Sequence, residues 1–207
     1  MLQKKKLCQN WKLYLITDRP SLGSKDLGRT VAEAIAGGAG VVQLRDKAAD
    51  RPRMIAAAIE LLKITRAAGV PLIINDSIAV AKASGADGVH LGQEDASLAE
   101  ARAALGGEAI IGRSTHSPEQ IRAAIAEGFD YIGVGPVYAT PTKPTYVPVG
   151  IELVRYAATN ATIPFVAIGG INATNVREVR AAGAKTIAAV RAVMGADDPR
   201  LAAAELL

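Results

Sequence analysis

Two fixed cations and an amide follow one short apolar run near the start of the chain. Gln43, Arg45 and Lys47 lie in the sequence VVQLRDK, where an apolar strand pattern gives way to polar residues. Arginine binds anions in a planar fork geometry, and lysine binds them as a point charge. This group of side chains is therefore suited to holding an anion.

The other apolar runs end in polar residues as well, except that the seventh ends in a glycine pair and the eighth in valine followed by arginine. In chain order these are Asp18 and Arg19; Asn75 and Asp76; Gln93, Glu94 and Asp95; Ser114 and His116; residues 140–143; Gly169 and Gly170; and Val190 and Arg191. Such a recurrence is typical of a barrel whose polar rim is an active site.

The carboxylates on this rim predict a magnesium site. Mg²⁺ usually takes one or two protein carboxylates and completes its shell with water and substrate phosphate, and Asp76 and Asp95 supply that number. A diphosphate chelated to Mg²⁺ would satisfy the cations and the carboxylates together. Each aspartate is equally suited to capping the Ala-rich helix that follows it, so both interpretations stay open.

A second anion site is indicated late in the chain. The pair Gly169-Gly170 follows the seventh run, and Arg191 follows the eighth. In parallel barrels the loops after strands seven and eight often bind phosphate. A glycine pair alone is weak evidence, because tight strand-to-helix turns use it too.

The two histidines form no metal motif. His116 is a candidate general acid or base and is equally suited to a structural role at a helix start. His90 lies between Val89 and Leu91, which favours a core or supporting position over direct chemistry.

The elements that position these residues follow from a repeated local pattern. At four places an Ala-rich helical stretch closes on glycine and a short β-rich run follows: Gly38, Gly85, Gly128 and Gly183. Glycine suits the left-handed residue that ends a helix, because it has no Cβ. Two further runs open with Pro71 and Pro164, as the first position of a strand permits.

With residues 13–17 and 109–112, these runs give eight apolar strands, each followed by a helical stretch. The alternation predicts a parallel sheet covered by helices, and eight units in 207 residues predict an α/β fold, a compact single-domain (β/α)8 TIM barrel. An open doubly wound sheet is the alternative. We assign residues 13–207 to the barrel and residues 1–12 to an N-terminal extension.

One connection is unusually long. Residues 137–149 carry hydroxyls, a lysine and several prolines, and long connections in compact domains are often binding loops. We expect this segment to close over a substrate; a tolerated surface excursion is the alternative.

Bulk composition narrows the functional class. Half of the residues are hydrophobic and the net charge is +4, but the basic residues are spread along the chain, which argues against nucleic acid as a partner. The single cysteine, Cys8, excludes an internal disulfide. No apolar run has the length of a secretory signal or a membrane span, so we expect no membrane association and a cytoplasmic location.

The chain resembles the thiamine-phosphate synthase family from Leu13 to about Pro199. The resemblance is carried in order by YLITD at 14–18, QLRDK at 43–47, IND at 74–76, VHLGQED at 89–95, GRSTH at 112–116, GVGPVYATPTK at 133–143 and IGGI at 168–171. It implies a magnesium-assisted, dissociative reaction in which 4-amino-2-methyl-5-(diphosphooxymethyl)pyrimidine and carboxythiazole phosphate give thiamine phosphate, diphosphate and CO2. The two partners of such a chain are phosphorylated small molecules.

The resemblance also implies residue roles. The pyrimidine diphosphate site would comprise Gln43, Leu44, Arg45, Asp46, Lys47, Asn75, Ser114 and Lys143, with Arg45, Lys47 and Lys143 as catalytic cations. The thiazole phosphate site would comprise Thr140, Pro141, Thr142, Gly170, Val190 and Arg191. Asp76 and Asp95 would hold Mg²⁺.

Two positions depart from the family pattern. Asp46 stands where the family often has glutamate, and Arg191 stands where it often has a small hydroxyl residue. Arg191 could bind the thiazole phosphate or crowd it. The alternatives to the synthase are the related thiazole tautomerase and a non-catalytic phosphate-ligand sensor on the same barrel.

Overall fold

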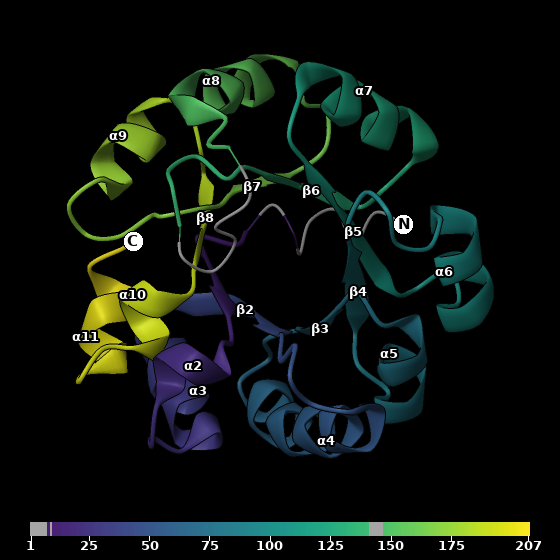
Figure 1. Ribbon diagram of the computed structural model, residues 1–207, viewed down its shortest axis with the longest axis vertical. Coiled ribbons are helices and arrows are strands. Elements are labelled where there is room, and N and C mark those ends of the chain that lie inside the picture. The colour runs from purple at the N-terminus through teal and green to yellow at the C-terminus, as the bar shows by residue number, and fades with distance from the viewer. Residues whose placement is uncertain (1–7, 9, 141–146) are drawn as a thin grey trace.

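The computed structural model describes residue 8, residues 10–140 and residues 147–207. Its strands form one closed parallel barrel in chain order (Figure 1). They are β1 (Leu13–Ile16), β2 (Ala39–Leu44), β3 (Leu72–Asn75), β4 (Gly88–Leu91), β5 (Ile110–Thr115), β6 (Tyr131–Val134), β7 (Phe165–Ala167) and β8 (Thr186–Ala189). The predicted (β/α)8 barrel is confirmed. An open sheet is excluded, because β1 pairs with β8.

Helices surround the barrel on its outer side (Figure 1). They are α2 (Arg19–Leu22), α3 (Leu27–Ala36), α4 (Arg51–Ala67), α5 (Ile78–Ser84), α6 (Leu98–Leu105), α7 (Pro118–Glu127), α8 (Gly150–Asn160), α9 (Val176–Ala181), α10 (Arg191–Met194) and α11 (Pro199–Ala204). The helices that follow β1 to β5 begin at Ser or Asp N-caps whose side chains accept a backbone N–H, which satisfies one of the amides a helix start leaves unpaired.

The glycines and prolines that the sequence analysis singled out lie at helix ends and strand starts in the structure. The four predicted helix-ending glycines, Gly38, Gly85, Gly128 and Gly183, all have positive φ, at 108°, 70°, 91° and 103°. The carbonyls of Pro71 and Pro164 accept hydrogen bonds from Val42 and Ile132 of the neighbouring strands, so each proline joins the sheet through its oxygen at the point where its strand begins.

The period of two along each strand divides the apolar side chains into two cores. In β1, Leu13 and Leu15 belong to the layer between strands and helices, whereas Tyr14 and Ile16 belong to a smaller cluster inside the barrel. Cys8 and Trp11, from the expected N-terminal extension, are buried in that inner cluster. These two residues therefore contribute to the packing of the barrel.

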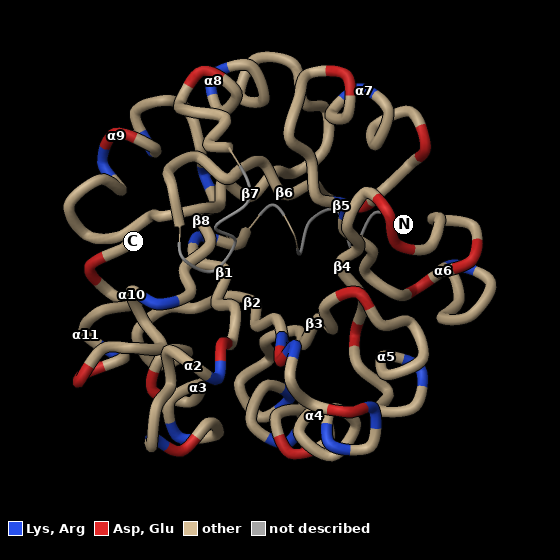
Figure 2. Tube along the Cα trace, in the orientation of Figure 1, with Lys and Arg blue, Asp and Glu red and all other residues tan. Residues whose placement is uncertain are grey.

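Charged side chains are interspersed around the outer ring. Figure 2 shows Lys and Arg alternating with Asp and Glu along the helices, with both signs also present at the loops around the barrel opening. In the part of the chain that the structure describes, no helix combines the length and the apolar character that crossing a membrane requires.

Candidate active site

A cavity of about 340 Å³ opens among the residues that end the strands. Eight residues predicted from the sequence line it: Gln43, Arg45, Asn75, Ser114, Thr140, Gly170, Val190 and Arg191. The structure brings them together because all eight strands are parallel, so that their carboxyl ends share one face of the barrel.

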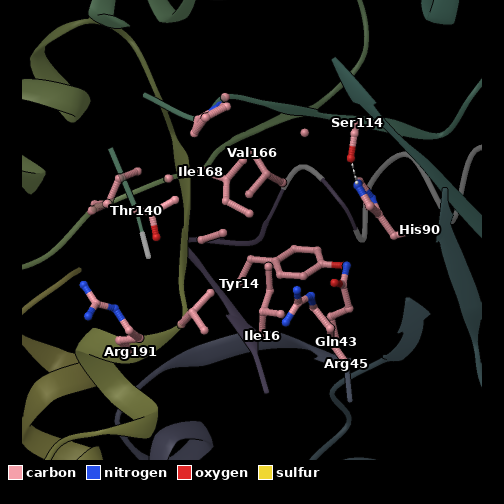
Figure 3. Close-up of a pocket in the computed structure, with 18 of the residues that line it drawn as sticks. Tyr14, Ile16, Gln43, Arg45, His90, Ser114, Thr140, Val166, Ile168 and Arg191 are labelled. Carbon is pink, nitrogen blue, oxygen red and sulfur yellow. Dashed lines mark hydrogen bonds between the residues drawn. The ribbon is translucent and has the colours of Figure 1, made fainter. Parts of the chain in front are cut away.

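The lining has two polar sides with an apolar middle (Figure 3). Gln43, Arg45, His90 and Ser114 lie on one side, and Thr140 and Arg191 lie on the other. The apolar residues between them include Ile16, Val166 and Ile168. This arrangement suits two ligands, each with a polar or charged end, that meet over an apolar floor.

Five other predicted residues lie in the described chain but do not line this cavity: Leu44, Asp46, Lys47, Asp76 and Asp95. The Leu44 side chain is buried in the outer core, so only its backbone is placed toward the site. Asp46 forms an ion pair with Arg19 at 3.4 Å and accepts the amides of Ala48 and Ala49. Lys47 is exposed at the rim.

The remaining predicted residues, Pro141, Thr142 and Lys143, lie outside the described residues. The same holds for residues 141–146 of the long connection between β6 and α8, so its expected closure over substrate stays a prediction.

A continuous chain of hydrogen bonds supports the first polar side. Gln43 Nε2 donates to Tyr14 Oη at 2.9 Å, and Tyr14 Oη lies 2.9 Å from Tyr131 Oη. Tyr131 Oη lies 3.0 Å from His90 Nδ1, and His90 Nε2 lies 3.0 Å from Ser114 Oγ, the bond drawn in Figure 3. Burial raises the pKa of both tyrosines well above the ordinary value of 10.

Residues at the end of β1 fix Arg45 on this side of the cavity. Thr17 Oγ1 donates to the Arg45 carbonyl at 3.0 Å and accepts the Arg45 amide at 2.9 Å. The guanidinium donates to Asp18 Oδ1 at 3.1 Å, and both side chains are only 11% exposed. Asp18 also caps α2 by accepting the amide of Ser21. Both the backbone and the charge of Arg45 are thus held before any ligand binds.

The helix-cap interpretation of the two predicted magnesium ligands is wrong. Ser77 caps α5 and Ser97 caps α6, each by accepting a backbone amide three residues further along. Asp76 and Asp95 therefore do not cap either helix. Asp76 instead has a φ of 62°, an uncommon left-handed conformation for a residue other than glycine.

The contacts of the two carboxylates keep them at the rim. Asp76 accepts a hydrogen bond from Asn75 Nδ2 at 2.6 Å, and Asp95 accepts the Gly92 amide at 2.6 Å. Both side chains are exposed, and they follow neighbouring strands, since β3 pairs with β4. No group of three or more His, Cys, Asp or Glu suited to a metal occurs among the described residues. Two rim carboxylates fit Mg²⁺, which needs few protein ligands.

The second polar side contains a tight double-glycine turn. Gly169 and Gly170 have φ values of 110° and 66°. A Cβ at Gly170 would lie 2.7 Å from Tyr138 Cβ and 2.9 Å from the Ala139 carbonyl oxygen. Tyr138 is held there by its amide, which donates to the Gly169 carbonyl at 3.0 Å. Backbone rather than side chain therefore faces the cavity at this turn.

Three cavity or supporting residues were not identified as functional from the sequence. Tyr131 stands in an apolar run and carries no local signal. His90 was expected to be a core or supporting residue, yet it lines the cavity; the period of two, with Val89 and Leu91 outward, could have placed it inside. Tyr14 alternates with Leu13 and Leu15 in the same way.

His116 also lines the cavity, and its ring is held by a backbone carbonyl. Its Nδ1 donates to the carbonyl of Gly135, and its amide donates to Gln120 Oε1 at 2.7 Å. The Gly135–Pro136 peptide bond is cis. The ring therefore has a structural contact with the backbone that follows β6.

Comparison with known proteins identifies the family. The sequence model of thiamine monophosphate synthase matches residues 13–193. This chain belongs to the thiamine monophosphate synthase family. It is 46% identical over 198 residues to the thiamine-phosphate synthase of Chloroflexus aurantiacus, covering 95% of this chain and 91% of that protein.

Two further relatives show how this family member compares in length and fold. The thiamine-phosphate synthase of a Synechocystis strain is 48% identical over 199 residues, which are 96% of this chain but 57% of that protein. The chain thus spans little more than half the length of several curated relatives that it matches. The structure of thiamine phosphate pyrophosphorylase from Pyrococcus furiosus superposes with a TM-score of 0.87 at 40% identity, covering 97% of this chain and 95% of that one.

Proposed function

We propose that this protein is a thiamine-phosphate synthase. It joins 4-amino-2-methyl-5-(diphosphooxymethyl)pyrimidine to carboxythiazole phosphate and releases diphosphate and CO2. The observation that carries the proposal is the cavity with a cation at each side, Arg45 and Arg191, in a chain of this family. Two phosphorylated substrates need two separated anion sites and a shared middle where they react.

The chain's main task in this reaction is to stabilise charge on the leaving group. The methylene C–O bond breaks, its electron pair leaves with the diphosphate, and a cation remains that the aminopyrimidine stabilises. Arg45 would neutralise the departing diphosphate, and its contacts with Thr17 and Asp18 at the cavity edge support this role. Preorganised charge of this kind needs no rearrangement as the negative charge develops.

The second substrate is held so that its nitrogen can capture the cation. The thiazole nitrogen forms the new C–N bond, and loss of CO2 returns electrons to the thiazole ring. Gly170, Thr140 and Arg191 on the far side of the cavity would hold its phosphate. Holding two reactants in contact replaces an encounter in solution with a step within one complex, which lowers the entropic part of the barrier. The reaction requires no general base from the protein.

Asp76 and Asp95 would hold Mg²⁺ at the rim near the diphosphate. When bound, the metal neutralises phosphate charge and completes its shell with phosphate oxygens and water. Lys47 at the rim, and Lys143 outside the described residues, would add the remaining positive charge.

The test is a product assay with the full chain. We expect thiamine phosphate to form when both substrates and Mg²⁺ are supplied, and its formation to stop when a chelator removes the metal. Folded protein that binds the phosphorylated thiazole without forming product would instead support the tautomerase or the sensor. Product that forms equally well with the chelator would contradict the magnesium site.

A further inference from the structure

Five side chains on five different strands form one hydrogen-bonded chain inside the barrel. It runs from Gln43 on β2 through Tyr14 on β1, Tyr131 on β6 and His90 on β4 to Ser114 on β5. Gln43, Tyr14, His90 and Ser114 all line the cavity, although Gln43, Tyr14 and Tyr131 are only 3%, 2% and 1% exposed. Both tyrosine hydroxyls are bonded to partners within the hydrogen-bonded chain, so a ligand in the cavity meets polar groups at its two ends, Gln43 and Ser114.

The number of hydrogens on these side chains fixes the direction in which the hydrogen bonds are donated. Each tyrosine has a single hydroxyl hydrogen, and burial keeps both phenols protonated by raising their pKa. Because Gln43 donates to Tyr14, the Tyr14 hydrogen is left for Tyr131, and the Tyr131 hydrogen is left for His90 Nδ1. The neutral His90 ring then carries its hydrogen on Nε2.

The same count of hydrogens decides which groups Gln43 and Ser114, at the two ends, offer to a ligand. His90 Nε2 donates to Ser114 Oγ, so the Ser114 hydroxyl keeps its own hydrogen for the cavity. Gln43 uses one N–H of its NH2 group on Tyr14, which fixes the orientation of the amide and leaves its oxygen to accept, beside the second N–H. The cavity thus presents an acceptor at Gln43 and a donor at Ser114.

The opposite direction is unfavourable unless the whole chain reverses. If Tyr131 donated to Tyr14, the buried Tyr14 hydroxyl would accept from both Gln43 and Tyr131. Its own hydrogen would then have no acceptor among these side chains, and an unpaired donor away from water is costly. Full reversal requires the Gln43 amide to turn over, and then both ends change role together. The chain therefore couples Gln43 and Ser114 although they stand on different strands.

We infer that Tyr14, Tyr131 and His90 are positioning residues that select an amino heterocycle over its oxo counterpart. An amino group beside an unprotonated ring nitrogen offers one donor and one acceptor, which complement Gln43 and Ser114. The oxo form, with a carbonyl beside a ring N–H, offers the opposite pair. This inference rests on the proposed function, because the pyrimidine of the proposed substrate carries the 4-amino group.

The first test reads the direction of the chain without substrate. The protein has two histidines, and the structure expects them to be opposite tautomers. His90 should carry its hydrogen on Nε2, whereas His116, whose Nδ1 donates to the Gly135 carbonyl, should carry it on Nδ1. Nitrogen-15 spectra of the labelled full chain distinguish the two, with His116→Asn to assign the signals.

The second test removes a hydroxyl from the middle of this hydrogen-bonded chain of side chains. Tyr131→Phe removes one hydroxyl and leaves the two end residues, Gln43 and Ser114, unchanged. Tyr14→Phe is the second variant should the first fail to fold. The matched control is Tyr156→Phe, which loses a hydroxyl bonded to Arg122 on the outer helices. The measured quantity is the ratio of kcat/KM for the 4-amino diphosphate to that for its 4-oxo analogue.

We expect the wild type and the Tyr156→Phe control to prefer the amino substrate by about 100-fold or more, and Tyr131→Phe to reduce this preference roughly tenfold. The His90 spectrum should change in Tyr131→Phe and stay unchanged in the control. A wild-type His90 with its hydrogen on Nδ1 would overturn the assigned direction. An unchanged preference in both tyrosine variants would overturn the selection role.

The tests separate this inference from the proposed function. If the wild type forms no product, the proposed function fails, and the His90 spectrum still decides the direction of the chain. If product forms but the His90 tautomer is opposite, only the inference fails.

Discussion

Replacing Gly170 by alanine tests whether the second polar side depends on close backbone packing. The residue has a φ of 66°, and an added Cβ would lie 2.7 Å from Tyr138 Cβ and 2.9 Å from the Ala139 carbonyl oxygen. The variant therefore combines backbone strain with a steric overlap that the neighbouring loop must relieve. Gly69 is a matched control, because its φ is 67° and an added Cβ would meet nothing within 4 Å.

The two costs separate in this comparison. Placing alanine in the left-handed region costs about 1.5 kcal/mol of the free energy of unfolding, which we expect for Gly69→Ala. Overpacking adds about 2 kcal/mol, so Gly170→Ala should lose about 3.5 kcal/mol. For a chain of this size these losses correspond to Tm decreases of about 4 °C and about 10 °C.

Urea denaturation of both variants measures the difference, and steady-state kinetics measure its effect on function. We expect Gly170→Ala to raise the KM for the thiazole phosphate, since the turn that we propose holds this phosphate must move, and Gly69→Ala to leave the KM unchanged. Equal losses of stability in the two variants would refute the steric part of the argument. A normal KM in Gly170→Ala would remove this turn from the phosphate site.

Three further predictions concern charged and titrating groups. Asp76→Asn and Asp95→Asn should each lower kcat on the order of 100-fold by weakening magnesium binding. Each should change the free energy of unfolding by less than about 1 kcal/mol, because serines cap both helices. A large loss of stability with unchanged magnesium dependence would contradict this prediction. Asp18→Asn keeps an oxygen for the helix cap but removes the charge that orients Arg45, so the KM for the pyrimidine diphosphate should rise about tenfold. An unchanged or lower KM would mean that the Asp18 carboxylate only reduces the positive charge that Arg45 offers to the ligand. Burial and donation to a nearby carboxylate raise the pKa of Tyr138 from 10 to about 12, so the stability it contributes is fully present below pH 10 and is lost as the pH rises to about 12. Urea denaturation across this range should show a shallower loss in Tyr138→Phe, and identical curves would refute the assignment.

The sequence by itself determined the architecture, because the signals for it are local. A glycine such as Gly85 or Gly128 ends its helix whatever packs around it, since the left-handed conformation is costly for other residues. Proline at 71 opens its strand for an equally local reason, the missing N–H. Eight such units imply a barrel, and a parallel barrel places the residues after each strand on one face. Gln43, Arg45 and their counterparts could therefore be assigned to one cavity in advance.

Tertiary structure decided which partner each polar group has. The aspartates at 76 and 95 and the serines that follow are both plausible caps in sequence, and only the backbone conformation shows that the serines accept the helix amides. Tyr14 and Tyr131 are separated by 117 positions, and they meet because closing the barrel turns alternate residues of β1 and β6 into the same interior. Hydrogen-bond partners of this kind depend on distances across the whole closed sheet, which no local pattern in the chain encodes.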